Sequence, residues 1–131
     1  MQRACCLVCN GHGEVMVVHR KVGNQWEIPS STVQLGETPQ AAAVRALREA
    51  LGVQVRITQK LGSRDGAQSN QKYTWFLAEI TGGEPRLQDL QQCDKWGYFS
   101  LVTLTQRYSE LSEGTKSFLE AMAYGEIDLD V

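Results

Sequence analysis

The pattern of apolar and polar residues divides the chain into short strands and two helices. Two apolar runs, over 4–9 and 14–19, are separated by the turn sequence Asn-Gly-His-Gly at 10–13. Apolar runs bounded in this way are typical of a β-hairpin, so we expect two adjacent strands. A short extended segment is expected over 25–29, and a polar loop should follow it and end at Gly36.

Residues 39–51 form the most regular segment, and their pattern predicts an amphipathic helix. Thr38 precedes the segment as a candidate N-cap, Pro39 occupies the first helical position, and Gly52 provides the C-terminal stop. Because small apolar residues gather on one side of this helix, we expect it to lie close against a sheet. That side contains Ala42, Ala43, Ala46, Leu47, Ala50 and Leu51.

The remaining segments predict further strands and a second helix. Residues 53–58 alternate between apolar and polar, and 73–80 form a longer aromatic strand. The polar segment 62–71 between them is expected to form a mobile hairpin loop. A strand over 96–99 and a helix over 113–124 complete the pattern. Strands outnumber helices, which favours the α/β (α+β) class with a mixed β-sheet flanked by helices.

Length and composition are those of one folded domain covering residues 1–131. The chain is 42% hydrophobic, and its 13 Lys and Arg against 15 Asp and Glu give a net charge of −2. This balance argues against nucleic-acid binding, which usually needs a basic patch. No stretch approaches the roughly 18 apolar residues of a membrane span, and the start lacks the apolar core of a signal peptide. We therefore expect a cytoplasmic protein without a membrane partner.

Three of the four cysteines lie close together at the start of the chain. The spacing of Cys6 and Cys9 is that of a metal or redox pair, but both lie in the apolar run that predicts a buried strand. Small thiols pack well in such strands, and no second Cys or His pair at ligand spacing accompanies them. We therefore favour a packing role over zinc or a disulfide.

The segment from Trp26 to Val53 resembles a Nudix box. That family's signature is Gly, five residues, Glu, seven residues, and then Arg-Glu-Leu-x-Glu-Glu-x-Gly-Leu, in which the leucines can be other aliphatic residues. Three positions of this chain differ from the signature: Ser31 replaces the first Gly, and Ala46 and Ala50 replace two glutamates. The matching positions are Glu37, Arg45, Leu47, Glu49, Gly52 and Val53.

The resemblance implies a Nudix-type α/β/α sandwich and a Mg²⁺- or Mn²⁺-dependent pyrophosphohydrolase. The substrate would be a small nucleotide, a nucleoside diphosphate linked to another group. Carboxylates at positions 46, 49 and 50 of such a helix would project from one side and bind a divalent cation. Only Glu49 remains here, so we expect weak activity. A catalytically inactive module that binds a nucleotide or a protein stays open as the alternative.

Further roles follow from the same resemblance. Glu49 is the expected metal ligand and catalytic residue, while Glu37 and Arg45 are expected to pair across the loop and, with Gly52, to have a structural role. Asp89 is the first candidate for an additional metal ligand or base. We nevertheless favour a solvated loop carboxylate over a ligand or base. By analogy with the family, a homodimer is reasonable.

Other residues near these positions have two interpretations each. The second candidate for the loop carboxylate is Asp94. Arg20 and Lys21 end the second strand and could bind phosphate, although cations at strand ends are common. His19 is better explained as a packed strand residue than as an acid or base. Aromatic strand residues could stack on a base but are mostly core; they are Tyr73, Trp75, Phe76 and Tyr98.

Overall fold

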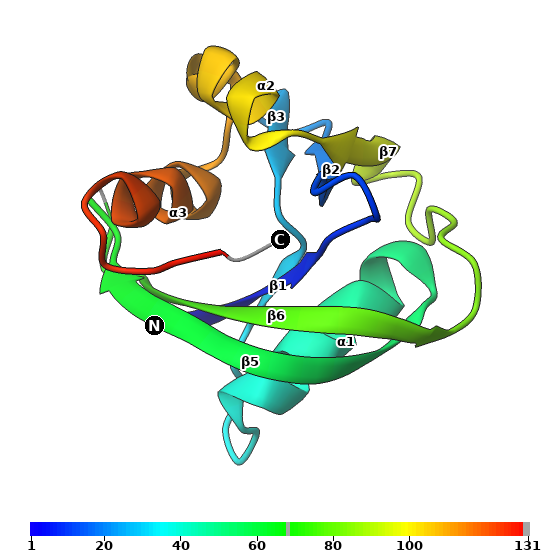
Figure 1. Ribbon diagram of the computed structural model, residues 1–131. Helices are drawn as coiled ribbons and strands as arrows, with labels where there is room; N and C mark the ends of the chain where they lie inside the picture. The colour runs from blue at the N-terminus through cyan, green and yellow to red at the C-terminus, as the bar shows by residue number, and fades with distance from the viewer. Residues whose placement is uncertain (68, 130–131) are drawn as a thin grey trace.

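The computed structural model describes residues 1–67 and 69–129, which form two β-sheets and flanking helices (Figure 1). Their order along the chain is β1 (Gln2–Val8), β2 (Val15–Arg20), β3 (Gln25–Glu27), β4 (Ser30–Thr32), α1 (Pro39–Leu51), β5 (Gln54–Asp65), β6 (Lys72–Gly82), β7 (Cys93–Phe99), α2 (Leu101–Gln106), a 3-10 turn (Tyr108–Glu110) and α3 (Glu113–Ala123).

The strands divide between a four-stranded and a three-stranded sheet. The larger sheet has the order β4-β1-β6-β5 and is mixed, because β1 and β6 run parallel while the other neighbours are antiparallel. The smaller sheet has the order β3-β2-β7 and is antiparallel. The predicted class, a mixed sheet with flanking helices, is therefore confirmed, with the strands distributed over two sheets.

The expected hairpin between the first two strands is wrong. The turn at 10–13 does reverse the chain, and the Asn10 side chain accepts hydrogen bonds from the backbone N–H groups of His12 and Glu14 at 3.0 Å each. Beyond one bridge between Cys9 and Val15, however, β1 and β2 belong to different sheets. Both strands are apolar on two faces and are buried on both, and each has other strands at its two edges: β4 and β6 flank β1, and β3 and β7 flank β2.

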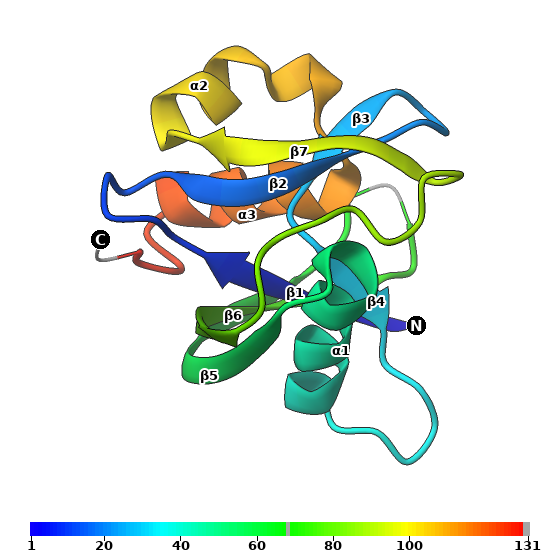
Figure 2. The same cartoon turned by 90° about the vertical axis from the view of Figure 1, so that its right-hand side faces the viewer.

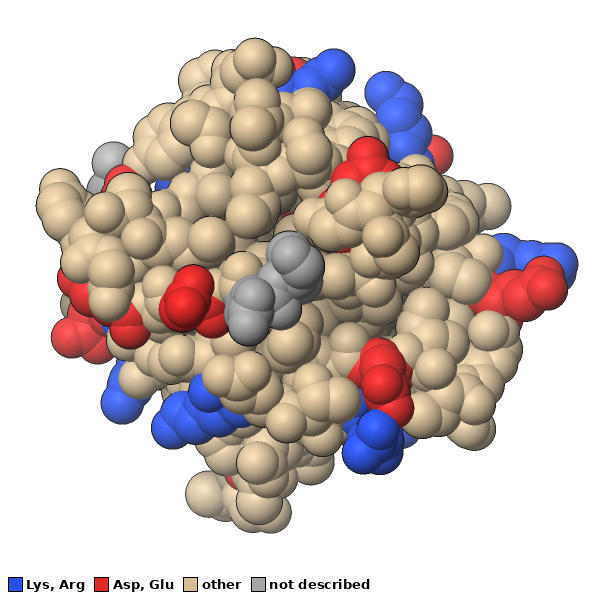
Figure 3. All heavy atoms as spheres, viewed as in Figure 1, with Lys and Arg blue, Asp and Glu red and all other residues tan. Residues whose placement is uncertain are grey.

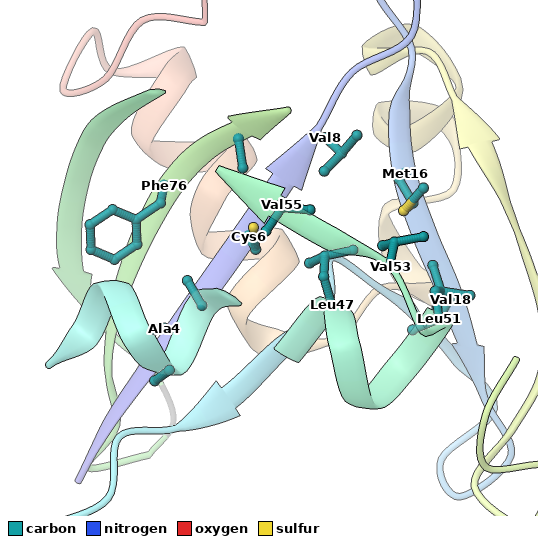
Figure 4. Packing of buried hydrophobic residues seen from close by; sticks show 13 residues of the cluster. Ala4, Cys6, Val8, Met16, Val18, Leu47, Leu51, Val53, Val55 and Phe76 are labelled. Atoms are coloured by element: carbon teal, nitrogen blue, oxygen red, sulfur yellow. The ribbon is translucent and has the colours of Figure 1, made fainter. Parts of the chain in front are cut away.

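Helix α1 has the predicted bounds, caps and buried face. The Thr38 Oγ1 accepts a hydrogen bond from Ala41 N at 3.1 Å, and Gly52 closes the helix with φ of 69°. Leu47 and Leu51 are fully buried in one core cluster with Cys6 of β1 and Val55 of β5, and Leu51 lies near Val18 of β2 (Figure 4). The thin alanine face lets the helix approach the sheet, which fixes the position of its charged side.

The other face of the larger sheet forms a second core with the smaller sheet and α3 (Figure 2). Phe118 of α3 lies 6.0 Å from Trp75 between ring centroids, and both side chains are buried. The helix expected over 113–124 is thus confirmed as α3. The sequence pattern did not indicate α2 or the 3-10 turn.

Two segments expected to be loops contain strand. Within the polar loop before Gly36, Ser30–Thr32 forms β4, which pairs with β1. The loop expected over 62–71 begins later, because β5 continues to Asp65 and remains paired with β6. Polar side chains hide β4 and the last residues of β5 from a hydrophobic pattern, because each of these strands lies at a sheet edge.

Two features of the surface bear on the expected partners. Among the described residues, no helix has the length and apolar character needed to cross a membrane. On the face shown in Figure 3, Lys and Arg side chains are scattered, with Asp and Glu between them.

Candidate active site

A cleft of about 220 Å³ opens where α1, β2 and the loop before β7 meet. The chain brings together charged side chains that lie far apart in sequence, from the end of a strand, the last turn of a helix and a loop. The lining residues are Val18, Arg20, Glu27, Pro29, Ser30, Ala46, Glu49, Ala50, Asp89, Gln92 and Cys93. We name this the α1 cleft.

Arg20 lies at the wall of the α1 cleft and is held by two partners. Its Nη1 donates to Glu27 Oε2 at 3.1 Å, and its Nη2 donates to Gln92 Oε1 at 3.2 Å. Burial raises the pKa of the Glu27 carboxyl, and the Arg20 guanidinium beside it opposes that rise. The pair fixes a guanidinium fork at the cleft while part of Arg20 stays exposed.

Glu37, Arg45 and Glu49 form a chain of hydrogen bonds along the outer side of α1. Arg45 donates from Nε and Nη2 to the two carboxylate oxygens of Glu37, both at 2.9 Å, and from Nη1 to Glu49 Oε1 at 2.8 Å. Its Nη2 also donates to Thr32 O at 2.7 Å, which ties the helix to β4. These bonds from Arg45, with one from Gln34 N, hold the pKa of Glu37 at about 2.

Glu49 reaches the α1 cleft with its side chain 58% exposed. The neighbouring helix positions that face the same cleft are Ala46 and Ala50. Methyl groups therefore occupy the part of the helix where two further carboxylates would lie. One oxygen of Glu49 accepts from Arg45, which leaves the other oxygen available to a ligand.

The segment between β3 and α1 is fixed by two serine interactions. The Ser31 hydroxyl is buried and donates to Ala42 O at 2.7 Å. The Ser30 carbonyl accepts from Arg3 Nη2 at 3.3 Å, and the Ser30 hydroxyl accepts from the same atom at 2.9 Å. The Ser30 carbonyl is thus held by a guanidinium from β1.

Of the other predicted site residues, one lines the α1 cleft and two lie outside it. Asp89 lines the α1 cleft on an exposed loop, where its Oδ1 accepts from Gln91 N at 3.1 Å. Lys21 is exposed in the turn after β2 and does not line the cleft. Asp94 lies on β7, also outside the cleft lining, and accepts from His19. The structure therefore brings Arg20, Glu49 and Asp89 together and leaves Lys21 and Asp94 apart.

His19 is a packed strand residue, as the strand pattern predicts. It is 7% exposed, lies 5.0 Å from Trp26 between ring centroids, and has a partner at each ring nitrogen. Nδ1 faces Asp94 Oδ1 at 2.7 Å, and Nε2 faces Asn24 Oδ1 at 2.8 Å. The bond to His19 lowers the pKa of Asp94.

The sequence pattern missed Glu27, Gln92 and Arg3 as residues at or beside the cleft. Glu27 carries a usable signal, because it is a charged residue between Trp26 and Ile28 in a short apolar stretch. A charge in such a position usually has a partner, which here is Arg20. Of the four aromatic candidates, Tyr73, Trp75 and Phe76 are core residues, and Tyr98 is partly buried against the core.

The sequence model of the NUDIX domain family matches residues 1–122. The chain belongs to the Nudix family. It is 30% identical to a putative 8-oxo-dGTP diphosphatase of Bacillus subtilis over 83 residues, 63% of this chain and 56% of that protein. It is 30% identical to an RNA pyrophosphohydrolase of Shewanella sediminis over 116 residues, 72% of this chain and 67% of that protein. The chain thus spans only 56% of the Bacillus protein's length.

Solved structures confirm the Nudix fold. A MutT NUDIX hydrolase from Burkholderia pseudomallei superposes with a TM-score of 0.73 at 22% identity, over 92% of this chain and 97% of that one. A MutT protein from Methanosarcina mazei gives a TM-score of 0.75 at 15% identity, over 96% of this chain and 94% of that one. The segment predicted to resemble a Nudix box, Trp26 to Val53, accordingly contains the end of β3, all of β4, α1 and the turns on both sides of that helix.

Nudix hydrolases generally use divalent metal ions, and the donor set of this cleft is poorer than a resident metal needs. Within residues 1–67 and 69–129, no group of three or more His, Cys, Asp or Glu side chains could hold a metal ion. Glu49 is the one carboxylate on the cleft side of α1, and Arg45 engages it. The residues therefore do not fit a resident metal. They fit a cation that arrives already coordinated by phosphates.

Proposed function

We propose that this Nudix domain binds the Mg²⁺ complex of a nucleoside diphosphate linked to another group, and hydrolyses its phosphoric anhydride slowly. The observation that carries the proposal is the meeting of Arg20, Glu49 and Asp89 in the α1 cleft from three separate segments. In this assignment Arg20 binds a phosphate oxygen, and Glu49 contacts the cation of the incoming complex. Asp89 assists as the nearest loop carboxylate.

The charge of the α1 cleft supports a nucleotide that enters with its cation. The lining contains three carboxylates, of which Arg20 pairs with Glu27 and Arg45, from outside the lining, pairs with Glu49. The third, Asp89, has no ion pair within residues 1–67 and 69–129, so the cleft has an excess of negative charge. A free polyanion would be repelled by this excess of negative charge, whereas a magnesium complex presents a cation to it. Mg²⁺ commonly takes one or two protein carboxylates and completes its shell with phosphates and water.

The low rate follows from the missing carboxylates on the cleft side of α1. With alanine at 46 and 50, a single helix carboxylate is left to position the cation and the attacking water. The Ser30 carbonyl is held by Arg3, and the Ser31 hydroxyl is held on α1. These same observations favour the alternative function, a module that binds a nucleotide or a protein without turnover.

The test measures phosphate and pyrophosphate release from a panel of nucleoside diphosphate derivatives and triphosphates with Mg²⁺ and with Mn²⁺. The parent chain is compared with Glu49→Gln and with Ala46→Glu/Ala50→Glu. The variant Ala46→Gln/Ala50→Gln controls for side-chain size at the same two positions. Glu79→Gln, in an exposed ion pair with Arg56 on the larger sheet, controls for the loss of one surface carboxylate.

We expect slow release by the parent chain, a further loss in Glu49→Gln, and a gain of at least tenfold in the double glutamate variant. The double glutamine variant should show no gain, since an amide is a weaker ligand for Mg²⁺ than a carboxylate. Robust turnover that survives Glu49→Gln would contradict the role of Glu49. Nucleotide binding by calorimetry without any release would favour the alternative, and absence of both would exclude nucleotide function.

A further inference from the structure

A second cleft of about 270 Å³ lies beside the α1 cleft and shares Arg20, Glu27 and Ser30 with it. It opens between the strands of the two sheets and the first turn of α3, and we name it the α3 cleft. Besides the shared residues, its lining contains Arg3, Cys5, Gln25, Ile28, Gln71, Tyr73, Ser112, Gly114 and Thr115. The shared residues make the two clefts direct neighbours.

The two clefts differ in charge. The α1 cleft has three carboxylates and one guanidinium, whereas the α3 cleft has two guanidiniums, of Arg3 and Arg20, and one carboxylate, of Glu27. Arg20 is already paired with Glu27. The excess positive charge of the α3 cleft therefore comes from Arg3. This charge favours binding of an anion in the α3 cleft.

Arg3 is half-buried and has only neutral partners in the described part of the chain. Its Nη1 donates to Thr32 Oγ1 at 3.1 Å, and its Nη2 donates to the Ser30 carbonyl and hydroxyl. No acidic side chain among residues 1–67 and 69–129 forms an ion pair with it. These bonds fix the guanidinium at the cleft wall and leave its charge for a ligand to neutralise.

The opposite wall of the α3 cleft supplies further donors. Ser112 is the residue before α3, and its side chain makes no capping bond to the helix. Gly114 and Thr115, in the first turn, line the cleft, so the N-terminal end of the helix faces the same space as Arg3. Glu113 of the same turn lies outside the cleft lining, where its carboxylate accepts from the Tyr73 hydroxyl at 2.9 Å. The Ser112 and Thr115 hydroxyls bond to each other at 3.0 Å, which uses one of their two O–H groups. The other O–H group, with that of Ser30, whose oxygen accepts from Arg3, can donate to a phosphate.

We propose that the α3 cleft is a phosphate subsite centred on Arg3, and that the substrate is a nucleoside diphosphate derivative carrying an additional phosphate on its nucleoside. This inference rests on the proposed function for the position of the diphosphate in the α1 cleft. The added phosphate lies between the Arg3 guanidinium and the first turn of α3. The buried Tyr73 side chain lines the same cleft.

The first experiment compares the affinities of ADP and of ADP with a further phosphate on its 3′-hydroxyl, both with Mg²⁺, by calorimetry. The 3′-phosphate should tighten binding by about tenfold, the value of one charge-assisted contact. Arg3→Gln should abolish this gain and change the affinity for ADP itself much less. Arg3→Lys, which keeps the charge without the fork, should retain part of it. Arg56→Gln, the same substitution in an exposed pair, should behave as the parent.

The second experiment titrates the ¹⁵N-labelled parent with inorganic phosphate in EDTA and follows backbone amides. We expect the largest shifts at Gly114 and Thr115, smaller ones at Ala46 and Ala50, and loss of the effect in Arg3→Gln. Thermal unfolding of each variant shows whether it is folded. If Arg3→Gln does not fold, the titration of Arg3→Lys tests whether the shifts depend on the Arg3 guanidinium.

Equal affinities of the parent for the two nucleotides would overturn the subsite and leave the proposed function intact. If neither nucleotide binds, the proposed function fails, and the phosphate titration then decides the subsite independently. Shifts at α3 that require Arg3 would support an anion site, and their absence would overturn it.

Discussion

Arg20 and Glu27 form an ion pair that joins neighbouring strands and lies in the wall shared by the two clefts. Arg20 Nη1 lies 3.1 Å from Glu27 Oε2, and the Glu27 side chain is 11% exposed against 36% for Arg20. Burial favours the neutral acid and raises the pKa of Glu27, while Arg20 favours the charged form. The guanidinium therefore keeps a buried carboxylate compatible with the fold.

Arg20→Gln should destabilise the fold at neutral pH and do so less in acid. It leaves Glu27 without its cation, at a cost of about 1–3 kcal/mol in the free energy of unfolding. Because the pKa of Glu27 is raised in the folded state, its carboxyl favours folding while it is protonated, at pH values below its unfolded-state pKa. This contribution is lost as the pH rises through the folded-state pKa. Without Arg20 that pKa rises further, so the loss should be larger at about pH 7 than near pH 5.

Urea unfolding of Arg20→Gln at the two pH values measures this effect. Arg56→Gln, which breaks an exposed pair with Glu79, should cost less than about 1 kcal/mol at both. Adding Glu27→Gln to Arg20→Gln should remove the pH dependence. A loss that is the same at both pH values would show that Glu27 is not the group responsible.

A second prediction concerns Glu37 and the acid side of the stability curve. Its pKa of about 2, set mainly by hydrogen bonds from Arg45, lies below that of an unfolded Glu. Stability from this group is therefore fully present above about pH 4.5 and is lost as pH falls toward about 2. Glu37→Gln should lower stability at neutral pH and flatten the curve in that acid window.

Unfolding followed by circular dichroism across the acid range tests this expectation. Glu110→Gln provides the matched control, since Glu110 is exposed and its pair with Arg107 is long, at 3.7 Å. Its curve should follow that of the parent. If Glu37→Gln keeps the parent's slope below pH 4.5, the Arg45 pairing does not contribute to acid stability.

The parts of the fold that the sequence predicts are those in which local chemistry and burial agree. Thr38 and Gly52 mark both ends of α1, and both caps form as predicted. The pairing of β1 with β4 and β6 was not predictable, because a strand that is apolar on both faces carries no sign of which neighbours cover it. The same limit hid the division into two sheets.

The candidate site also has a part that the sequence predicts and a part that it does not. The box register predicts that Glu37 and Arg45 pair, and the structure has that pair at 2.9 Å. Arg3 was missed because its contact with Ser30 forms only when β1 pairs with β4, 27 residues further along the chain. Glu27 lies only seven residues from Arg20, but the hydrophobic pattern does not show which side chains meet across β2 and β3. A contact between distant segments leaves no periodic trace in the sequence.

A third prediction follows from the two bonds of His19. His19→Phe keeps an aromatic ring in contact with Trp26 but removes both hydrogen bonds of the imidazole. Asp94 and Asn24 then lose their hydrogen-bond partner at this position. We expect a loss of about 1–3 kcal/mol in the free energy of unfolding and unchanged nucleotide affinity, because His19 does not line the α1 cleft. Calorimetry and urea unfolding give the two readouts. His12→Phe, in the exposed turn before β2, should change neither.

The fourth prediction separates the two consequences of serine at position 31. Its buried hydroxyl donates to Ala42 O at 2.7 Å, so Ser31→Ala should lower the free energy of unfolding by about 0.5–1.5 kcal/mol. Ser31→Gly, which introduces the residue of the Nudix signature, loses the same bond and adds chain entropy to the unfolded state. It should therefore cost a further 0.5–1 kcal/mol or so. Thr105→Ala removes an exposed hydroxyl that donates to Leu101 O at 2.8 Å and should have little effect. If Ser31→Gly instead proves as stable as the parent, the Ser31 bond does not hold β4 against α1.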